Sequence, residues 1–224
     1  MIELSALWEP IRLSLQTAVA ALLIVFVAGT AAGWCMSRYT FRGKLIIETI
    51  FLLPTVLPPT VVGFLLITIF GTYGVVGNFL YSLFDLSLMF TWTAAVITAV
   101  IVAFPFMYQS VKVGLDSVDR DIENAARVDG ASEWEVFLFI SLPLSLKSII
   151  AGLVHRSARR RRRALGEFGA TLMFAGNIPG RTQTAPIAIF TAMEAGNMTL
   201  AWTLVVILVV ISFAMLLSIR TFAR

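Results

Sequence analysis

The chain has 224 residues, of which 58% are apolar and only 13% charged, and its mean hydropathy is +0.89. An ordinary soluble domain has roughly 45–50% apolar and about 25% charged residues, so this composition excludes a water-soluble globular protein and predicts an all-α integral membrane protein. The formal net charge is +4, and the single Cys35 and single His155 exclude a disulfide framework and a metal site built from cysteine or histidine clusters.

Apolar stretches with few or no charges divide the chain into about five predicted membrane spans, because a helix needs about 20 apolar residues to cross the hydrocarbon layer. In chain order they cover residues 13–36, 46–70, 91–111, 136–156 and 200–219, and a glycine-punctuated loop follows the second. Gly29 and Gly33 in the first span are spaced to let two helices approach closely. The first apolar run is too long for a signal peptide, so we expect it to stay as a helix.

Lys and Arg near the span ends predict the orientation, because cytoplasmic loops are enriched in these cations. Only Arg12 and Arg181 fall on one side of the membrane. Eight fall on the other side: Arg38, Arg42, Lys44, Lys112, Arg120, Arg127, Arg220 and Arg224. The count predicts a multi-pass protein with its N-terminus outside and its C-terminus in the cytoplasm.

The cytoplasmic loop 113–135 is too long and too patterned for a simple turn. Asp119 or Asp121 is suited to cap a helix, and Glu123 then lies in its first turn, where the helix dipole favours anions. Ala126 and Gly130 are four residues apart and are expected to share a bare helix face. Glu123, Arg127, Asp129 and Glu133 are expected to form a polar rim around that face. Two interpretations stay open, a docking helix and an amphipathic helix lying on lipid headgroups.

The spacing Glu123-x-Ala125-Ala126, three residues, Gly130, nine residues, Ile140-x-Leu142-Pro143 resembles the EAA–G–I–LP signature of ABC-importer permease subunits. Residues 164–184, ALGEFGATLMFAGNIPGRTQT, resemble molybdate permeases closely and sulfate permeases less closely. The proline-rich stretch 52–66 is similar to the same family. The resemblance covers residues 11–154 and 164–222.

This resemblance implies a type I permease fold in the plasma (inner) membrane of a prokaryote. It implies a homodimer with a pathway between the copies, a cytoplasmic dimer of ATP-binding subunits, and an extracytoplasmic molybdate-binding protein. Glu123, Ala125, Ala126 and Gly130 are implied to lie at the coupling contact with the ATPase. Ile140, Leu142 and Pro143 are implied to begin the next span. A tungstate or sulfate/thiosulfate permease is the alternative within this class, and a membrane scaffold or channel without an ATPase is the alternative outside it.

The residue content is consistent with a transport subunit whose ATP hydrolysis takes place on a separate protein. No G-x-x-x-x-G-K-[ST] phosphate-binding loop is present, so we expect ATP hydrolysis on a partner, and no enzyme activity, catalytic residue, cofactor or metal in this chain. The spans hold no cluster of carboxylates, which argues against a proton-driven carrier. Lipid is the expected environment, and no nucleic-acid partner is expected.

Three prolines interrupt the second span. Pro54, Pro58 and Pro59 break the helical hydrogen-bond ladder, and the freed carbonyls need partners in protein or water. One interpretation places this face, with Thr55 and Thr60, along the translocation pathway; the other is a structural kink packed on the third span. Glu167 in the segment LGEFG is either an external gate or binding-protein contact, or a carboxylate bonded to nearby backbone.

Residues 155–163, HRSARRRRR, depart from the family pattern. Five arginines at mid-bilayer would cost on the order of 12–17 kcal/mol, so they are not expected there. Three interpretations stay open: a sequence artefact such as a frameshift, a genuine segment at the outer headgroups, and a nucleic-acid or nuclear-targeting patch.

Overall fold

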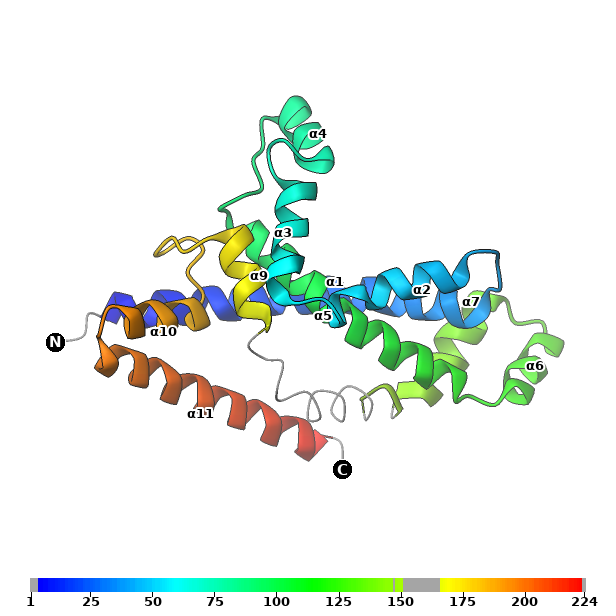
Figure 1. Cartoon of the computed structure of the whole chain (residues 1–224). Helices are drawn as coiled ribbons and strands as arrows, with labels where there is room; N and C mark the ends of the chain where they lie inside the picture. Colours follow the sequence, from blue (N-terminus) through cyan, green and yellow to red (C-terminus); the bar gives the residue numbers. More distant parts are fainter. Residues whose placement is uncertain (1–3, 147, 151–165, 223–224) are drawn as a thin grey trace. The chain divides into compact units, whose positions relative to one another are not determined.

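The computed structural model describes residues 4–146, 148–150 and 166–222, which form helices and connecting loops without a β-strand (Figure 1). The elements in chain order are α1 (Leu4–Arg38), α2 (Lys44–Leu52), the 3₁₀ helix η1 (Leu53–Thr55), α3 (Pro59–Phe70), α4 (Val75–Phe84), α5 (Trp92–Asp116), α6 (Arg120–Val128), α7 (Glu133–Glu135), the π-helix η2 (Val136–Ser141), α9 (Gly166–Ala175), α10 (Ala185–Glu194) and α11 (Met198–Phe222). Residues 142–146 and 148–150 continue as helix after η2.

Four segments of the described chain are long and apolar enough to cross a membrane: Ala6–Arg38, Pro59–Phe84, Trp92–Asp116 and Met198–Met215. The predicted spans 13–36 and 200–219 lie inside α1 and α11, and the predicted span 91–111 lies inside α5 apart from its first residue. Of the predicted span 136–156, the described residues are helical, and residues 147 and 151–156 lie outside the described part.

The second span differs from its prediction. Residues 46–70 do not form one helix, because the prolines divide them into α2, η1 and α3. Residues 75–84 form α4 rather than part of a glycine-punctuated loop. The glycines permit this turn, since a Cβ at Gly74 or Gly77 would collide with the backbone of residues 68–71. The apolar segment is therefore Pro59–Phe84, shifted along the chain from the prediction.

Contacts divide the chain into two compact units, residues 1–20, 63–98 and 168–224, and residues 21–62 and 99–167. In the second unit, a core of Val25, Met107, Val111, Leu115, Phe137 and Ile149 joins α1, α5, η2 and the helix after η2. The predicted close approach at the glycine pair occurs here, between α1 and α5. A Cβ at Gly29 would lie 2.9 Å from Met107 Cβ, and one at Gly33 would lie 2.8 Å from Val111 Cβ.

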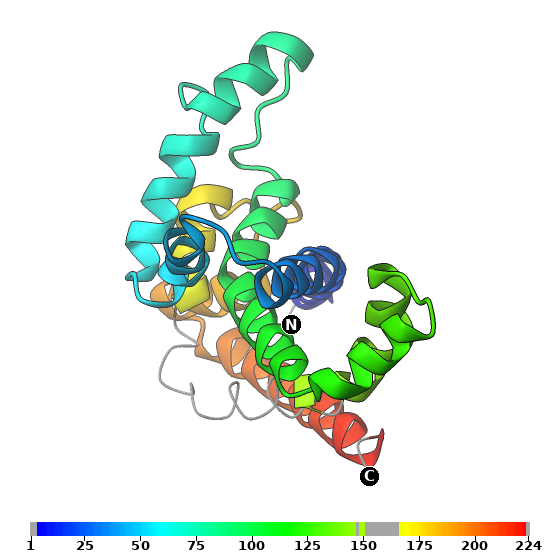
Figure 2. The same cartoon turned by 90° about the vertical axis from the view of Figure 1, so that its right-hand side faces the viewer.

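In the first unit, α10 packs along α11 around buried Ile11, Ala188 and Leu204. The start of α3 packs on α9, where a Cβ at Gly63 would lie 3.0 Å from Met173 Cβ. Figure 2 shows the same helices from a second direction.

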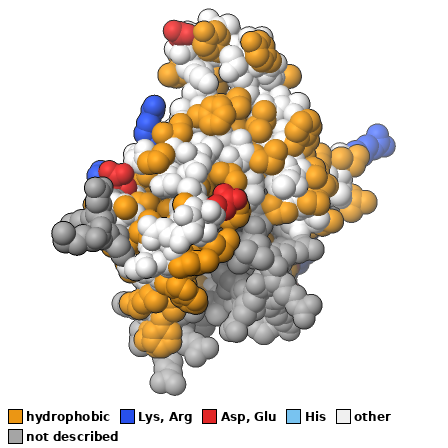
Figure 3. Space-filling model, turned by 60° about the vertical axis from the view of Figure 1, so that its left-hand side comes forward, with side chains coloured by type: hydrophobic (Ala, Val, Ile, Leu, Met, Phe, Trp, Pro, Cys, Tyr) orange, Lys and Arg blue, Asp and Glu red, His pale blue; other side chains and the backbone are white. Residues whose placement is uncertain are grey.

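Large apolar side chains lie on the outside of the long helices. Leu22, Leu23 and Val27 of α1 are 63–69% exposed, and Val209, Val210 and Phe213 of α11 are 60–64% exposed. Hydrophobic side chains also cover much of the face drawn in Figure 3. Because water disfavours so much exposed apolar surface, these helices are suited to a lipid environment, and the chain is a multi-pass membrane protein.

Candidate functional site

The short helix α6 forms the centre of the candidate site, and its first turn is capped as the sequence predicts. Asp119 is the N-cap residue, and its Oδ1 accepts a hydrogen bond from the Asp121 amide at 2.9 Å. Asp121 and Glu123 lie in the first turn, where the helix dipole stabilises negative charge.

The C-terminal end of α6 corrects one prediction. Gly130 does not share a helix face with Ala126, because α6 ends at Val128 and Gly130 has a φ of +93°. The Gly130 amide donates to the Arg127 carbonyl and the Ala131 amide to the Ala126 carbonyl, at 3.1 and 3.0 Å. This is the Schellman pattern, in which glycine is favoured for its left-handed conformation. A Cβ at Gly130 would meet nothing within 4 Å, so the need for glycine here is conformational.

Glu123 fastens α6 to two other elements of the same unit. Its side chain is only 3% exposed, and both of its carboxylate oxygens accept hydrogen bonds from the Arg38 guanidinium at the end of α1. The Ser141 hydroxyl, in η2, donates to Glu123 Oε1 at 2.6 Å and accepts from Arg38 Nη2 at 2.9 Å. A paired, bidentate contact of this kind is strong and geometrically specific.

The surroundings keep Glu123 ionised. Burial alone would raise its pKa, but the hydrogen bonds from Arg38 and Ser141, together with the charges of Arg38 and Arg127, outweigh burial and hold the pKa below its ordinary 4.5. The predicted polar rim is therefore wrong for Glu123, which is buried. The outer part of that rim is an ion pair, in which Arg127 Nε donates to Glu133 Oε1 at 2.6 Å.

A capping box and an aromatic cluster fix the segment after α6. Ser132 and Glu135 cap α7 reciprocally. Trp134 stands edge-on to Trp34 of α1 with ring centroids 5.8 Å apart, and Phe137 lies 5.2 Å from Trp34. The π-helix η2 then places Ser141 towards Glu123; π-helical turns are frequent at functional sites.

The outward surface of α6 carries Ile122, Ala125 and Val128. Ile122 is 48% and Val128 87% exposed, and Ala125 is also exposed, whereas Ala126 is half-buried. These three residues recur at intervals of three and so lie along one side of the helix. Figure 1 shows α6 beside α7, at the end of this unit where α1 terminates.

The residues predicted to follow the coupling segment lie where the next helical stretch begins. Ile140 belongs to η2, Leu142 packs against the core, and Pro143 lies in the helix that follows.

The predicted pathway residues lie around the helix break, away from α6 along the chain. Pro54 and Thr55 form η1, where Thr55 Oγ1 donates to the Leu52 carbonyl at 2.7 Å, and Pro59 begins α3. Pro58 and Thr60 are exposed. Glu167 belongs to α9, but its side chain, like residues 155–163, lies outside the described part.

The family model described as binding-protein-dependent transport system inner membrane component matches residues 25–224. The chain belongs to this family. It is therefore a membrane component of a transport system rather than an enzyme.

Curated relatives of this transport component match nearly its whole length. It is 54% identical to the putative molybdenum transport system permease protein YvgM of Bacillus subtilis, over 98% of this chain and 95% of that protein. It is 39% identical to the molybdenum transport system permease protein ModB of Escherichia coli K12, over 97% and 93%. Identity to the sulfate transport system permease protein CysW of Synechococcus elongatus is 33%, over 90% and 69%.

A solved structure shares the fold of this family member. A chain of a bacterial ABC transporter involved in the import of the acidic polysaccharide alginate superposes with a TM-score of 0.79 at 18% identity, over 100% of this chain and 80% of that one. This likeness establishes an ABC importer permease fold.

Arg38 and Ser141 are the site residues of this transport component that sequence reasoning missed. Arg38 contributed only to the orientation count, and Ser141 lies between two residues of the signature. The available signal was Arg38 at the end of the first span together with Glu123 in a motif otherwise made of small residues. A carboxylate in such a motif needs a hydrogen-bonding or charged partner if it is buried.

Proposed function

We propose that this chain is the membrane-spanning permease subunit of an ABC importer that passes molybdate across the prokaryotic plasma membrane. Two copies would enclose the pathway, and ATP hydrolysis would take place on a separate cytoplasmic subunit. The 54% and 39% identities to molybdenum transport permeases support this substrate more strongly than the 33% identity to a sulfate permease.

The attachment of α6 is the observation that carries the coupling proposal. A helix can transmit the movement of a partner to membrane spans only if it is fixed to them. Arg38, Glu123 and Ser141 provide that attachment. The opposite requirement is a surface that a partner can reach, and Ile122, Ala125 and Val128 of α6 are exposed in the described part of the chain. Glu123 would then hold the coupling helix in place, and Ala125 would lie at the contact itself. Ala126 and Gly130 would shape the helix and its end.

The test is Ala125→Arg, which adds a long charged side chain to the exposed surface without removing any described interaction. The matched control is Thr40→Arg, an exposed position in the loop after α1, on the same predicted side of the membrane. We expect Ala125→Arg to abolish co-purification with the ATP-binding subunit and ATP-driven molybdate uptake, with the permease still present in the membrane. Normal co-purification and uptake in this variant would contradict the coupling role and favour the scaffold or channel.

Substrate choice requires its own measurement. Uptake of labelled molybdate by the reconstituted transporter is expected to resist equimolar sulfate, and equimolar tungstate gives the comparison for the second alternative. Loss of molybdate uptake to sulfate would favour the sulfate/thiosulfate permease. The binding protein should be varied independently, because it also selects the anion.

We also propose that the pathway follows the helix break at Pro54, Pro58 and Pro59, with Thr55 and Thr60 beside it. Thr60→Cys in a Cys35→Ser background tests this proposal with a membrane-impermeant thiol reagent. Labelling that changes when ATP is added supports the pathway, and a site that never labels favours the packed kink. Cysteines at residues 6 and 40 in the same background test the predicted orientation of the first span, with residue 6 outside and residue 40 inside. A role for Glu167 as an external gate or binding-protein contact is tested by Glu167→Gln.

A further inference from the structure

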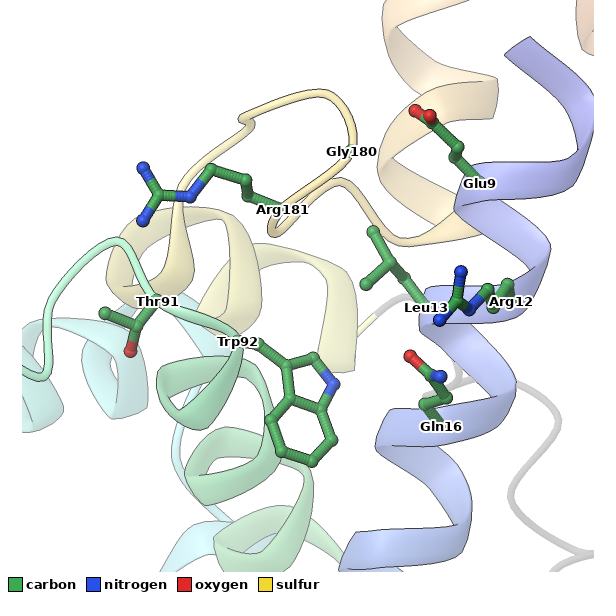
Figure 4. Close-up of a pocket in the computed structure, with 8 residues that line it drawn as sticks. All are labelled: Glu9, Arg12, Leu13, Gln16, Thr91, Trp92, Gly180 and Arg181. Atoms are coloured by element: carbon green, nitrogen blue, oxygen red, sulfur yellow. The ribbon is translucent and has the colours of Figure 1, made fainter. Parts of the chain in front are cut away.

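A cavity of about 430 Å³ lies in the first unit, near the N-terminal end of α1. It is lined by Glu9, Arg12, Leu13 and Gln16 of α1, Thr91 and Trp92 at the start of α5, and Gly180 and Arg181 of the loop before α10. Figure 4 shows Arg12 and Gln16 projecting from α1 towards Trp92, while the Arg181 side chain extends from its loop away from α1.

The lining is rich in hydrogen-bond donors that have no described partner. Within the described part of the chain, the guanidinium groups of Arg12 and Arg181, the Gln16 amide and the Trp92 indole N–H take part in no hydrogen bond or ion pair. The Thr91 hydroxyl differs, because it already donates to the Leu88 carbonyl at 2.5 Å. The four side chains that carry these donors are exposed, and donors of this kind match the acceptor oxygens of an anion.

The one carboxylate in the lining, that of Glu9, lies against the turn at Gly180. Glu9 Oε2 would lie 3.1 Å from a Cβ on Gly180, which has a φ of +72°, so this carboxylate rests against the turn that carries Arg181. The formal charge of the lining is +1, from two arginines and one glutamate. An anion in the cavity therefore gains a favourable field as well as donors.

The Arg181 loop is held in place by its own bonds. The Thr182 hydroxyl accepts from the Ile178 amide at 3.0 Å, and Gln183 Nε2 donates to Asn177 Oδ1 at 2.8 Å. The Ala185 amide, just past the loop, donates to Ser14 Oγ of α1 at 2.7 Å. The backbone positions that carry Arg12 and Arg181 are thus fixed within this unit, which lowers the ordering cost of binding a ligand.

The charge distribution gives an independent reason for a ligand. Arg12 and Arg181 are the two cations that the orientation count places outside, where span-flanking cations are disfavoured. Both line this one cavity. Two cations that lie on the disfavoured side and line one cavity are explained if they meet a negatively charged ligand.

We propose that this cavity is a low-affinity binding site for a tetrahedral oxyanion dianion, reached from the outer surface. The inference rests on the proposed function for the direction of transport. The cavity is at the small end of the usual range for ligand pockets, about 300–1,000 Å³, yet exceeds what one such ion needs, so the anion keeps part of its water. Partial hydration and exposed arginines make binding weak, as a transport pathway requires for release.

The test uses the complete transporter in proteoliposomes with saturating loaded binding protein, comparing Arg12→Gln, Arg181→Gln and the double variant. The matched control is Arg42→Gln, an exposed arginine in the loop after α1. We expect uptake to fall about threefold in each single variant and about tenfold in the double variant, since each loses one charged donor that is partly screened by water. Arg12→Lys should restore part of the uptake. Stimulation of the ATPase by the binding protein should stay unchanged, so that fewer ions enter per ATP hydrolysed.

Direct binding is measured without transport. Sulfate at constant ionic strength should change the Trp92 fluorescence of the wild-type complex, and chloride should not. Trp92→Phe and the arginine double variant should lose the response to sulfate.

If the wild-type transporter takes up no molybdate but keeps the sulfate response, the proposed function fails and the site stands. Unchanged uptake and an unchanged sulfate response in the double variant would overturn the site. ATPase stimulation falling together with uptake would assign the arginines to binding-protein contact instead. A loss seen only in phosphatidylglycerol vesicles, and not in phosphatidylcholine, would assign them to anionic lipid headgroups.

Discussion

Replacing Glu123 by methionine should detach α6 while leaving the membrane spans intact. The substitution removes the carboxylate that pairs with Arg38 and accepts from Ser141. Breaking a buried pair by removing one partner costs about 3–5 kcal/mol, because the other charge is left uncompensated. Arg38 is 19% exposed and can recruit some water, so we expect the lower end, about 3 kcal/mol.

The assay is hydrogen exchange of the amides of residues 120–128 in the detergent-solubilised protein. Since 1.4 kcal/mol is a factor of ten, a loss of about 3 kcal/mol predicts exchange on the order of 100-fold faster in α6. The amides in the middle of α5 should keep their wild-type protection. The matched control is Glu133→Gln, which removes only the exposed pair with Arg127 and should cost about 0.5 kcal/mol.

A double-mutant cycle separates the pair from the individual side chains. Arg38→Met together with Glu123→Met leaves no buried charge unpaired, so its cost should be about 2–3 kcal/mol below the sum of the two single changes. Additive costs, or unchanged α6 exchange in Glu123→Met, would refute the view that this ion pair holds the helix.

Three further changes probe the same unit. Gly130→Asn should destabilise the end of α6 by a few tenths of a kcal/mol, and Gly130→Val by about 1–2 kcal/mol, in the same exchange assay. The reason is that φ at this position is +93°, a conformation that asparagine tolerates better than valine. Equal costs for the two variants would contradict this. Gly33→Ala should lower the stability in thermal unfolding by about 1–3 kcal/mol through overpacking against Val111, with the exposed Ala31→Leu as a neutral control; an unchanged Tm would contradict the close approach. Since the folded-state pKa of Glu123 lies below 4.5, the attachment of α6 should be complete above pH 4.5 and weaken as the pH falls through that lowered pKa. A change in Trp134 emission should report this loss, and Glu123→Gln should remove the pH dependence.

Local rules predict the helical parts of the fold. The uncharged runs around α1, α5 and α11 are long enough to exclude any other membrane-spanning structure, and Asp119 followed by an acidic turn marks the start of α6. Residues 75–84 escape these rules. Their sequence is compatible with a helix as well as with the predicted glycine-punctuated loop. The deciding factor is the close packing at Gly74 and Gly77, which depends on how near the backbone of residues 68–71 lies and cannot be read from composition.

The candidate site is harder to predict because its central contact joins residues far apart in the chain. Glu123 is 85 residues from Arg38 and 18 from Ser141. A helical repeat places Glu123 in the first turn of α6 but does not say whether the carboxylate meets solvent or another helix. The glycine pair in α1 has the opposite character. Its spacing predicts a close approach but not the partner, which is α5.

The motif residues thus have separate physical tasks, and this affects how substitutions in it should be interpreted. Glu123 is almost completely buried, Ala125 is exposed, and Gly130 ends the helix in a conformation that favours glycine. Loss of transport in a Glu123 or Gly130 variant would therefore report a displaced or frayed α6, whether or not any partner touches those residues. Ala125 has neither burial nor unusual backbone geometry to explain a defect. A loss of activity at Ala125 with α6 exchange unchanged is consequently the result that isolates partner contact from helix placement.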